Sequence, residues 1–117
     1  MKLKICGILD INILQHACEA NVDFVGFIMA NNSPRKISND FLDSLENFNF
    51  LDTVPVFVFV NPSVEEVEKV TTKIENPILQ FHGDEGDNFC KQFNKSFWKT
   101  IRVKNSQSLE TLSLIHI

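Results

Sequence analysis

Short, almost continuously apolar runs alternate along the chain with stretches in which apolar residues recur every three or four positions. The apolar runs are typical of strands buried on both faces, and they span residues 2–6, 23–28, 54–60, 78–81 and 97–103. The stretches with helical spacing span residues 12–20, 38–48, 63–74 and 87–94, and another begins at 108. This repeated strand–helix order predicts parallel strands joined by right-handed crossovers, and therefore an α/β fold.

Two serines stand where helices are expected to begin. Ser38 precedes the apolar stripe of the second helical stretch, and Ser63 follows the turn Asn61-Pro62 at the end of the third strand. A serine hydroxyl accepts a hydrogen bond from an unpaired N–H of the first turn, so both residues are predicted N-caps. Asp84 and Glu85 are interpreted in the same way, as a cap for the helix that follows them.

The loop after the first strand bears on the choice between a barrel and an open sheet. Cys6-Gly7-Ile8 is too short and too poor in glycine for the phosphate-binding loop of a dinucleotide fold. A (β/α)₈ barrel typically needs about 200 residues or more. Five strand–helix units in 117 residues therefore predict an incomplete barrel.

Three side chains with useful chemistry follow apolar runs. Cys6 ends the first run, Arg35 lies in the polar stretch after the second, and His82 follows the fourth. The carboxyl ends of parallel strands are where α/β folds place their chemistry. Taken singly, each residue also has an ordinary structural interpretation: a buried thiol, a solvated loop arginine, a histidine held by nearby backbone. Helical positions predict packing or surface roles for His16, Cys18 and Cys90.

Composition excludes several classes of protein. The net charge is −4, with 11 dispersed basic residues against 15 acidic ones, which does not suit nucleic-acid binding. No apolar run approaches the roughly 20 residues of a membrane span. Three cysteines without metal-type spacing indicate a reduced, cytoplasmic protein without a metal site or a disulfide framework. No cofactor is implied.

Six segments of the chain form a pattern when they are taken together and in order. They are Lys4-Ile5-Cys6-Gly7-Ile8, Val22-Asp23-Phe24-Val25-Gly26-Phe27, Ser33-Pro34-Arg35, Val58-Phe59-Val60-Asn61, Leu79-Gln80-Phe81-His82-Gly83-Asp84-Glu85 and Lys99-Thr100-Ile101-Arg102-Val103. Over residues 2 to about 111, and in the family's order, these segments resemble the phosphoribosylanthranilate isomerase family of tryptophan biosynthesis. The resemblance implies a (β/α)₈ barrel and an Amadori rearrangement of N-(5-phosphoribosyl)anthranilate, a small-molecule substrate.

The resemblance assigns roles to individual residues. Cys6 matches the family's general base, which takes the C2 proton of a ring-opened iminium. Arg35 and His82 match substrate-binding residues, and Asp84 and Arg102 are secondary candidates. The family's general acid, an aspartate after the sixth strand, and its phosphate-binding backbone after strands seven and eight lie outside this chain.

The sequence departs from the family pattern in two places. Leu9 stands where threonine is usual, and residues 30–32, Ala-Asn-Asn, replace a stretch that usually contains an aromatic residue. Both departures concern the positioning of substrate.

The last six residues receive a separate interpretation. Leu112-Ser113-Leu114-Ile115-His116-Ile117 is what CTGTCTCTTATACACATC, a transposon end sequence used in DNA library preparation, would encode. We therefore interpret residues 1–111 as the N-terminal part of one TIM-barrel domain and residues 112–117 as a non-native tail. Such a part-barrel would have two open parallel edges, so we expect it to fold poorly or associate, and to be inactive alone.

Two other functions remain open from the residues. One is another sugar-phosphate TIM-barrel enzyme, such as a relative of ribulose-phosphate epimerase or indole-glycerol-phosphate synthase. The other is a noncatalytic half-barrel module that associates with a partner or with itself. The oligomeric state is not predicted.

Overall fold

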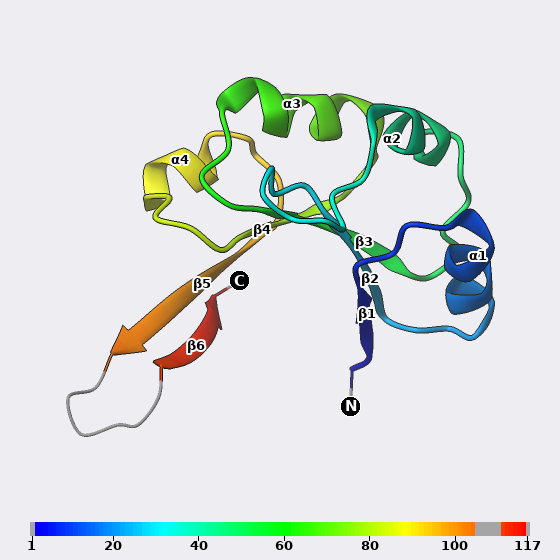
Figure 1. The fold of residues 1–117 in the computed structure, drawn as a ribbon, viewed down its shortest axis with the longest axis horizontal. Helices are drawn as coiled ribbons and strands as arrows, with labels where there is room; N and C mark the ends of the chain where they lie inside the picture. The colour runs from blue at the N-terminus through cyan, green and yellow to red at the C-terminus, as the bar shows by residue number, and fades with distance from the viewer. Residues whose placement is uncertain (1, 105–110, 117) are drawn as a thin grey trace.

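The computed structural model describes the backbone of residues 2–104 and 111–116 and the side chains of residues 2–99. Strands and helices alternate through β5, as the hydrophobic pattern predicts (Figure 1). The elements are β1 (Lys4–Cys6), α1 (Ile11–Glu19), β2 (Phe24–Ile28), α2 (Asn39–Leu45), β3 (Val54–Phe59), α3 (Val64–Lys73), β4 (Ile78–Phe81), α4 (Asp87–Lys91), β5 (Phe97–Lys104) and β6 (Thr111–His116).

The first five strands are parallel, and each pairs with the strand that precedes it in the chain. The sheet order is β1-β2-β3-β4-β5-β6, with no reversal along the parallel part. Figure 1 shows the four helices in an arc around one side of the sheet. An open doubly wound sheet would reverse its strand order and carry helices on both faces. This arrangement is instead the arc of a barrel.

Contacts across the inner side of the arc show how strongly the sheet is curved. Lys4 Nζ donates a hydrogen bond of 2.6 Å to Gln80 Oε1, which joins β1 to β4. The rings of Phe24 and Trp98 lie 4.9 Å apart and join β2 to β5. In a flat sheet, strands three places apart would be separated by about 14 Å. The predicted incomplete TIM barrel is therefore confirmed.

Successive residues of each strand point to opposite faces of the sheet. Odd-numbered residues pack beneath the helices, where Phe27 stacks on Phe57 at 5.2 Å and Phe59 on Phe81 at 5.9 Å. Even-numbered residues face the inner side, where Val56 and Gln80 of the central strands are buried and Cys6 of β1 is exposed. The central strands β3 and β4 are thus covered on both sides, which explains their nearly continuous apolar sequence.

Both predicted serine caps are present. Ser38 Oγ accepts a hydrogen bond from the backbone N–H of Phe41 at 3.0 Å, and Ser63 Oγ accepts one from Glu66 at 3.2 Å. The Ser63 hydroxyl also donates to Glu66 Oε1 at 3.3 Å, so the two side chains of this capping-box sequence are in contact.

The cap predicted for the fourth helix is wrong. α4 is capped by Gly86, with no side-chain hydrogen bond, and it ends at Lys91, earlier than expected. Glu85 Oε2 accepts a hydrogen bond of 2.7 Å from the backbone N–H of Asn61. The reason is tertiary: Asn61 follows β3, and the loop after β3 lies beside the loop after β4.

The helix predicted from residue 108 is also not found where the structure describes the chain. Residues 111–116 form β6, which pairs antiparallel with β5, with Thr111 opposite Lys104. Unpaired backbone groups at a sheet edge favour pairing with a nearby apolar segment. The expectation of two open parallel edges is therefore wrong, because β6 pairs with β5. The edge strands of the described sheet are β1 and β6, and of these only β1 belongs to the parallel part.

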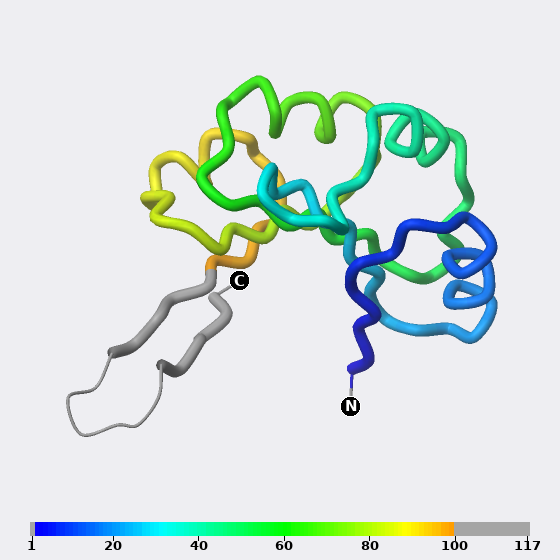
Figure 2. Tube along the Cα trace, in the orientation of Figure 1, coloured from blue at the N-terminus to red at the C-terminus, as the bar shows by residue number. Residues whose placement is uncertain are grey.

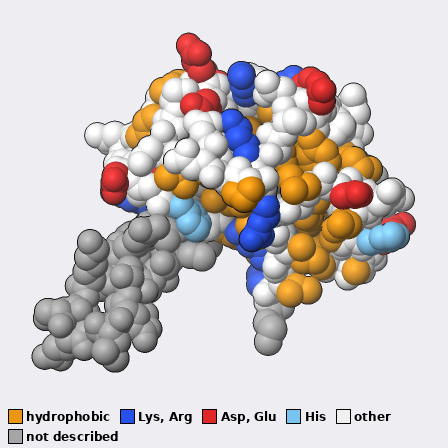
Figure 3. Space-filling model, in the orientation of Figure 1, with side chains coloured by type: hydrophobic (Ala, Val, Ile, Leu, Met, Phe, Trp, Pro, Cys, Tyr) orange, Lys and Arg blue, Asp and Glu red, His pale blue; other side chains and the backbone are white. Residues whose placement is uncertain are grey.

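Several apolar side chains near the β1 edge face solvent. They are Leu3, Ile5, Leu9 and Ile13, with Ile13 56% exposed. Figure 3 shows this apolar surface on the side of the molecule where β1 and α1 lie. In the described part of the chain, no helix is both long enough and apolar enough to cross a membrane.

Candidate active site

Cys6 is the last residue of β1, and its thiol is exposed. It lies opposite Gly26 of β2. A Cβ atom at Gly26 would come within 2.9 Å of Cys6 Sγ and 3.2 Å of Lys4 Cε. The missing side chain therefore allows the Lys4 and Cys6 side chains to lie against the backbone of β2 on the inner face.

The Arg35 side chain lies over Gly7, the residue that follows Cys6, although the two are far apart in sequence. The loop between β2 and α2 runs across the middle of the arc in the view of Figure 2. Within that loop, Ser33 Oγ accepts a hydrogen bond of 3.1 Å from the backbone N–H of Arg35. The Arg35 side chain covers Gly7, where a Cβ would lie 2.8 Å from Nη1. Gly7 also has a φ of 82°, a conformation that glycine adopts without strain.

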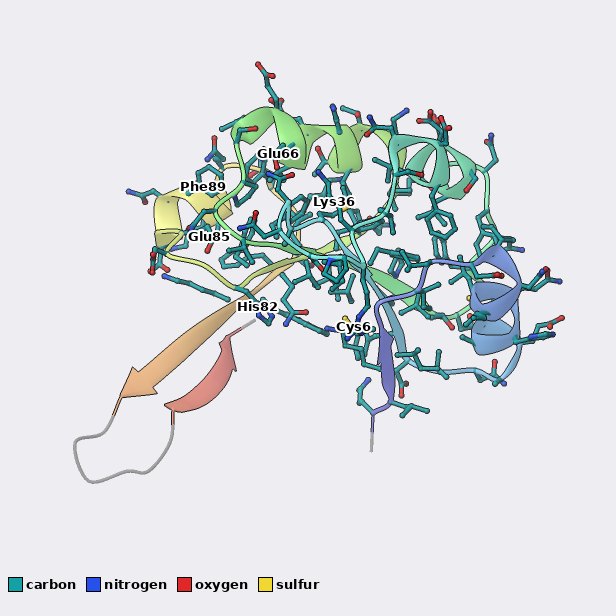
Figure 4. All side chains as sticks on the ribbon, viewed as in Figure 1. Cys6, Lys36, Glu66, His82, Glu85 and Phe89 are labelled. Carbon is teal, nitrogen blue, oxygen red and sulfur yellow. The ribbon has the colours of Figure 1, made fainter. Side chains whose placement is uncertain are left out.

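His82 follows β4 at the same end of the sheet. Its backbone N–H donates a hydrogen bond of 2.9 Å to the carbonyl of Phe59. Its ring Nε2 lies 2.7 Å from Gln80 Nε2. Figure 4 shows Cys6 and His82 inside the arc, apart from Glu85 and Phe89, which lie toward α4. The structure thus brings Cys6, Arg35 and His82 to one end of one face.

Lys4 and Gln80 are site residues that the sequence analysis did not identify. Each lies two positions before a predicted site residue, Cys6 or His82, and therefore on the same face of its strand. A polar side chain inside an otherwise apolar strand is the sequence feature that would have identified them. Gln80 is only 3% exposed, and its amide is hydrogen-bonded at both ends.

The electrostatics of the site centre on Lys4. Burial lowers the pKa of the Lys4 ammonium from its usual value, and the neighbouring Cys6 acts in the opposite direction. The Lys4 ammonium also lies 5.5 Å from the centre of the Trp98 ring, within range of a cation–π contact. Figure 3 shows basic side chains in the middle of this face of the molecule.

The other two cysteines have different surroundings. Cys18 and Cys90 are buried in helices, as predicted, and burial raises the pKa of both thiols. A protonated, buried thiol is a poor nucleophile and a poor base. Of the three cysteines, Cys6 alone is exposed.

The secondary candidates, Asp84 and Arg102, receive less support from the structure. The Asp84 carboxylate is exposed, and the Asp84 backbone N–H donates to Asn61 Oδ1 at 2.8 Å. Together with the Asn61–Glu85 hydrogen bond, this contact joins the loops after β3 and β4. The side chain of Arg102 lies outside the described residues. Among the side chains that are described, no three His, Cys, Asp or Glu residues are grouped as a metal site requires.

Comparison with known proteins identifies relatives over nearly the whole chain. The family model described as N-(5'phosphoribosyl)anthranilate (PRA) isomerase matches residues 3–116. The N-(5'-phosphoribosyl)anthranilate isomerase of Thermoanaerobacter sp. (strain X514) is 37% identical over 113 residues, covering 94% of this chain and 54% of the relative. That of Neisseria gonorrhoeae (strain ATCC 700825 / FA 1090) is 32% identical, covering 93% and 52%. The chain thus spans about half the length of these relatives.

Solved structures of phosphoribosylanthranilate isomerases superpose on this chain. A monomeric form of the dimeric phosphoribosylanthranilate isomerase of Thermotoga maritima superposes with a TM-score of 0.77 at 28% identity, covering 92% of this chain and 56% of that one. A phosphoribosylanthranilate isomerase in complex with reduced 1-(o-carboxyphenylamino)-1-deoxyribulose 5-phosphate gives a TM-score of 0.79 at 27% identity, with the same coverage.

Proposed function

The chain belongs to the N-(5'-phosphoribosyl)anthranilate isomerase family, and from this we propose that the protein catalyses the Amadori rearrangement of N-(5-phosphoribosyl)anthranilate. The product is 1-(2-carboxyphenylamino)-1-deoxyribulose 5-phosphate, an intermediate of tryptophan biosynthesis, and the reaction takes place in the cytoplasm. Internal proton transfer needs an acid and a base, so the proposal includes no cofactor.

In the proposed mechanism, Cys6 is the general base. The Cys6 thiolate removes the proton from C2 of the ring-opened iminium, and the electron pair forms a C1–C2 double bond while the iminium nitrogen becomes neutral. Loss of the C2 hydroxyl proton and protonation of C1 then give the ketone. The ring oxygen gains a proton when the ring opens and C1 gains one at the end, while C2 and its hydroxyl each lose one, so substrate and product have the same formula. The acid that opens the ribose ring comes from the part of the family barrel that this chain does not span.

The observation that carries the proposal is the exposed Cys6 thiol at the carboxyl end of the parallel strands, with the Arg35 side chain lying over the next residue, Gly7. A planar guanidinium suits both the carboxylate and the aromatic face of an anthranilate group. His82 completes the substrate contacts from β4. A relative with the same fold binds the reduced product, which supports this class of ligand.

The domain boundary is part of the proposal. We interpret residues 1–111 as the N-terminal part of the barrel and residues 112–117 as non-native, because a strand antiparallel to β5 departs from the repeated strand–helix order. Sequencing the genomic locus tests this interpretation. A stop codon directly after Ile117 would contradict it.

Isomerase activity is expected from the complete protein and not from residues 1–117 alone. The chain supplies the base and substrate contacts, whereas the acid and phosphate-binding backbone of the family lie elsewhere. The measurement is the loss of anthranilate fluorescence on conversion of freshly prepared substrate. Turnover by the purified 117-residue chain would contradict the division of the site between this chain and the rest of the barrel. A complete protein without turnover would contradict the proposed function.

A noncatalytic association module is the second candidate, and one observation favours it. Leu3, Ile5 and Ile13 expose apolar surface beside the unpaired β1 edge. An exposed apolar edge promotes association. Light scattering on the purified chain distinguishes the candidates: a defined soluble oligomer, together with an inactive complete protein, would favour the module.

Replacing Gly26 by valine is expected to lower kcat/KM of the complete protein about 100-fold. Any Cβ at position 26 comes within 2.9 Å of Cys6 Sγ, so the thiol must move, and a displacement of about 1 Å in a reacting group costs on this order. Gly86→Ala is the matched control, because a Cβ there meets nothing within 4 Å. Equal activity of Gly26→Val and the control would show that Cys6 has no fixed place in the reaction.

A further inference from the structure

A chain of two hydrogen bonds crosses the inner face of the sheet and ends on His82. Lys4 Nζ donates to Gln80 Oε1 at 2.6 Å, and Gln80 Nε2 lies 2.7 Å from His82 Nε2. Gln80 is 3% exposed, so water does not compete for its amide. The Lys4 stem packs on Gly26, and its ammonium lies 5.5 Å from the Trp98 ring. The position of the ammonium is therefore well determined.

The chemistry of these groups sets the direction of each hydrogen bond. A lysine ammonium has donors only, so the amide atom facing Lys4 must be the Gln80 oxygen. The Gln80 NH₂ group then faces His82, and it too has donors only. His82 Nε2 must accept, which requires a lone pair on that nitrogen. A neutral imidazole with a lone pair on Nε2 has its proton on Nδ1, and an imidazolium would place an N–H against the NH₂ group.

We propose that Lys4 is a positioning residue that acts through Gln80 and holds His82 as the neutral imidazole protonated on Nδ1. His82 then takes part in the site as an uncharged donor, and the group that Nδ1 contacts must be an acceptor. In the substrate class proposed above, that group is a carboxylate, phosphate or hydroxyl oxygen. This last assignment rests on the proposed function, whereas the tautomer does not.

Lys4 is the residue that distinguishes the two ends of the Gln80 amide. Without a cation, the amide can turn by 180° and present its oxygen to His82, and the Nε2-protonated tautomer or the imidazolium is then equally satisfied. Other titratable or charged side chains also lie at this end of the sheet: Cys6 at the end of β1, Asp10, Arg35 and Lys36 in the segments after β1 and β2, and Asp84 and Glu85 in the loop after β4. The two hydrogen bonds of the Gln80 amide described here join it to Lys4 and His82.

Nitrogen-15 NMR of the imidazole rings in the complete protein tests the proposal, because protonated and unprotonated ring nitrogens have widely separated shifts. At pH 7.5 we expect His82 Nε2 to be unprotonated and Nδ1 protonated. In Lys4→Met, which keeps a long apolar stem on Gly26, both nitrogens should move to intermediate shifts. Lys2→Met, an exposed lysine next to the same strand, should change neither. A protonated Nε2 in the wild-type protein, or an unchanged tautomer in Lys4→Met, would overturn the proposal.

Gln80→Glu keeps the shape of the side chain and replaces the NH₂ group that faces His82 by an oxygen. A carboxylate has acceptors only, so His82 Nε2 should become protonated. Persistence of the unprotonated Nε2 in this variant would also overturn the proposal, even where Lys4→Met does not fold. In turnover assays, Lys4→Met should lower kcat/KM about tenfold, as the loss of one oriented hydrogen bond does. An inactive wild-type protein with the expected tautomer would contradict the proposed function and leave this inference standing.

Discussion

Replacing Cys6 by alanine is expected to lower kcat of the complete protein by about 1,000-fold, with KM little changed. Cys6 is the exposed thiol at the end of β1, and the proposed mechanism assigns it the proton transfer from C2. Removing a general base typically costs 10²- to 10⁴-fold in rate. Because Arg35 and His82 remain, the substrate should still bind. Steady-state kinetics on the purified variant measure both constants.

The control for this substitution is Cys18→Ala. Cys18 is buried in α1, on the helical side of the sheet, and burial raises the pKa of its thiol, so it should contribute nothing to proton transfer. Its alanine variant should keep kcat within about twofold. Cys6→Ser tests the chemistry more closely, since it keeps the size of the side chain and removes the acidic thiol. If Cys6→Ala retains wild-type kcat, the general base is another residue.

Replacing Phe81 by alanine is expected to lower the free energy of unfolding of the complete protein by about 3–5 kcal/mol. Phe81 is fully buried, and its ring lies 5.9 Å from Phe59, 6.0 Å from Phe89, and 6.4 Å from both Phe93 and Phe97. The substitution removes apolar area from the core and leaves a cavity between β3, β4, α4 and β5. The surrounding rings belong to β3, α4, β5 and the turn after α4, and they cannot all move in to fill it.

Urea unfolding monitored by Trp98 fluorescence measures this loss. Leu51→Ala is the control, because Leu51 is 57% exposed and its truncation should change the free energy of unfolding by no more than about 0.5 kcal/mol. A domain is stable by about 5–15 kcal/mol, so the Phe81 effect is a large fraction of the total. A loss below about 1 kcal/mol for Phe81→Ala would show that the ring cluster is not a main part of the core.

The interpretation of the chain's first half depended on local physics, and the structure agrees with it closely. Strands on both sides of α1 and α2 follow from their apolar runs, and Ser38 and Ser63 cap their helices because a cap needs only the three residues that follow it. Glu85 shows the limit of such reasoning. It has the right composition for a cap, yet its carboxylate binds Asn61, which lies 24 residues away. Sequence order does not show which two loops are neighbours.

The sequence by itself determined the α/β class, the parallel direction of the strands and the placement of Cys6, Arg35 and His82 after the first, second and fourth strands, because these follow from hydrophobic period, chain order and the handedness of crossovers. Only the tertiary structure showed that Lys4 on β1 reaches Gln80 on β4, that Gly26 makes room for Cys6, and that residues 111–116 pair with β5 instead of forming a helix. Each of these depends on the curvature and edges of the sheet. Curvature and edges arise from all the strands together and are encoded in no single segment.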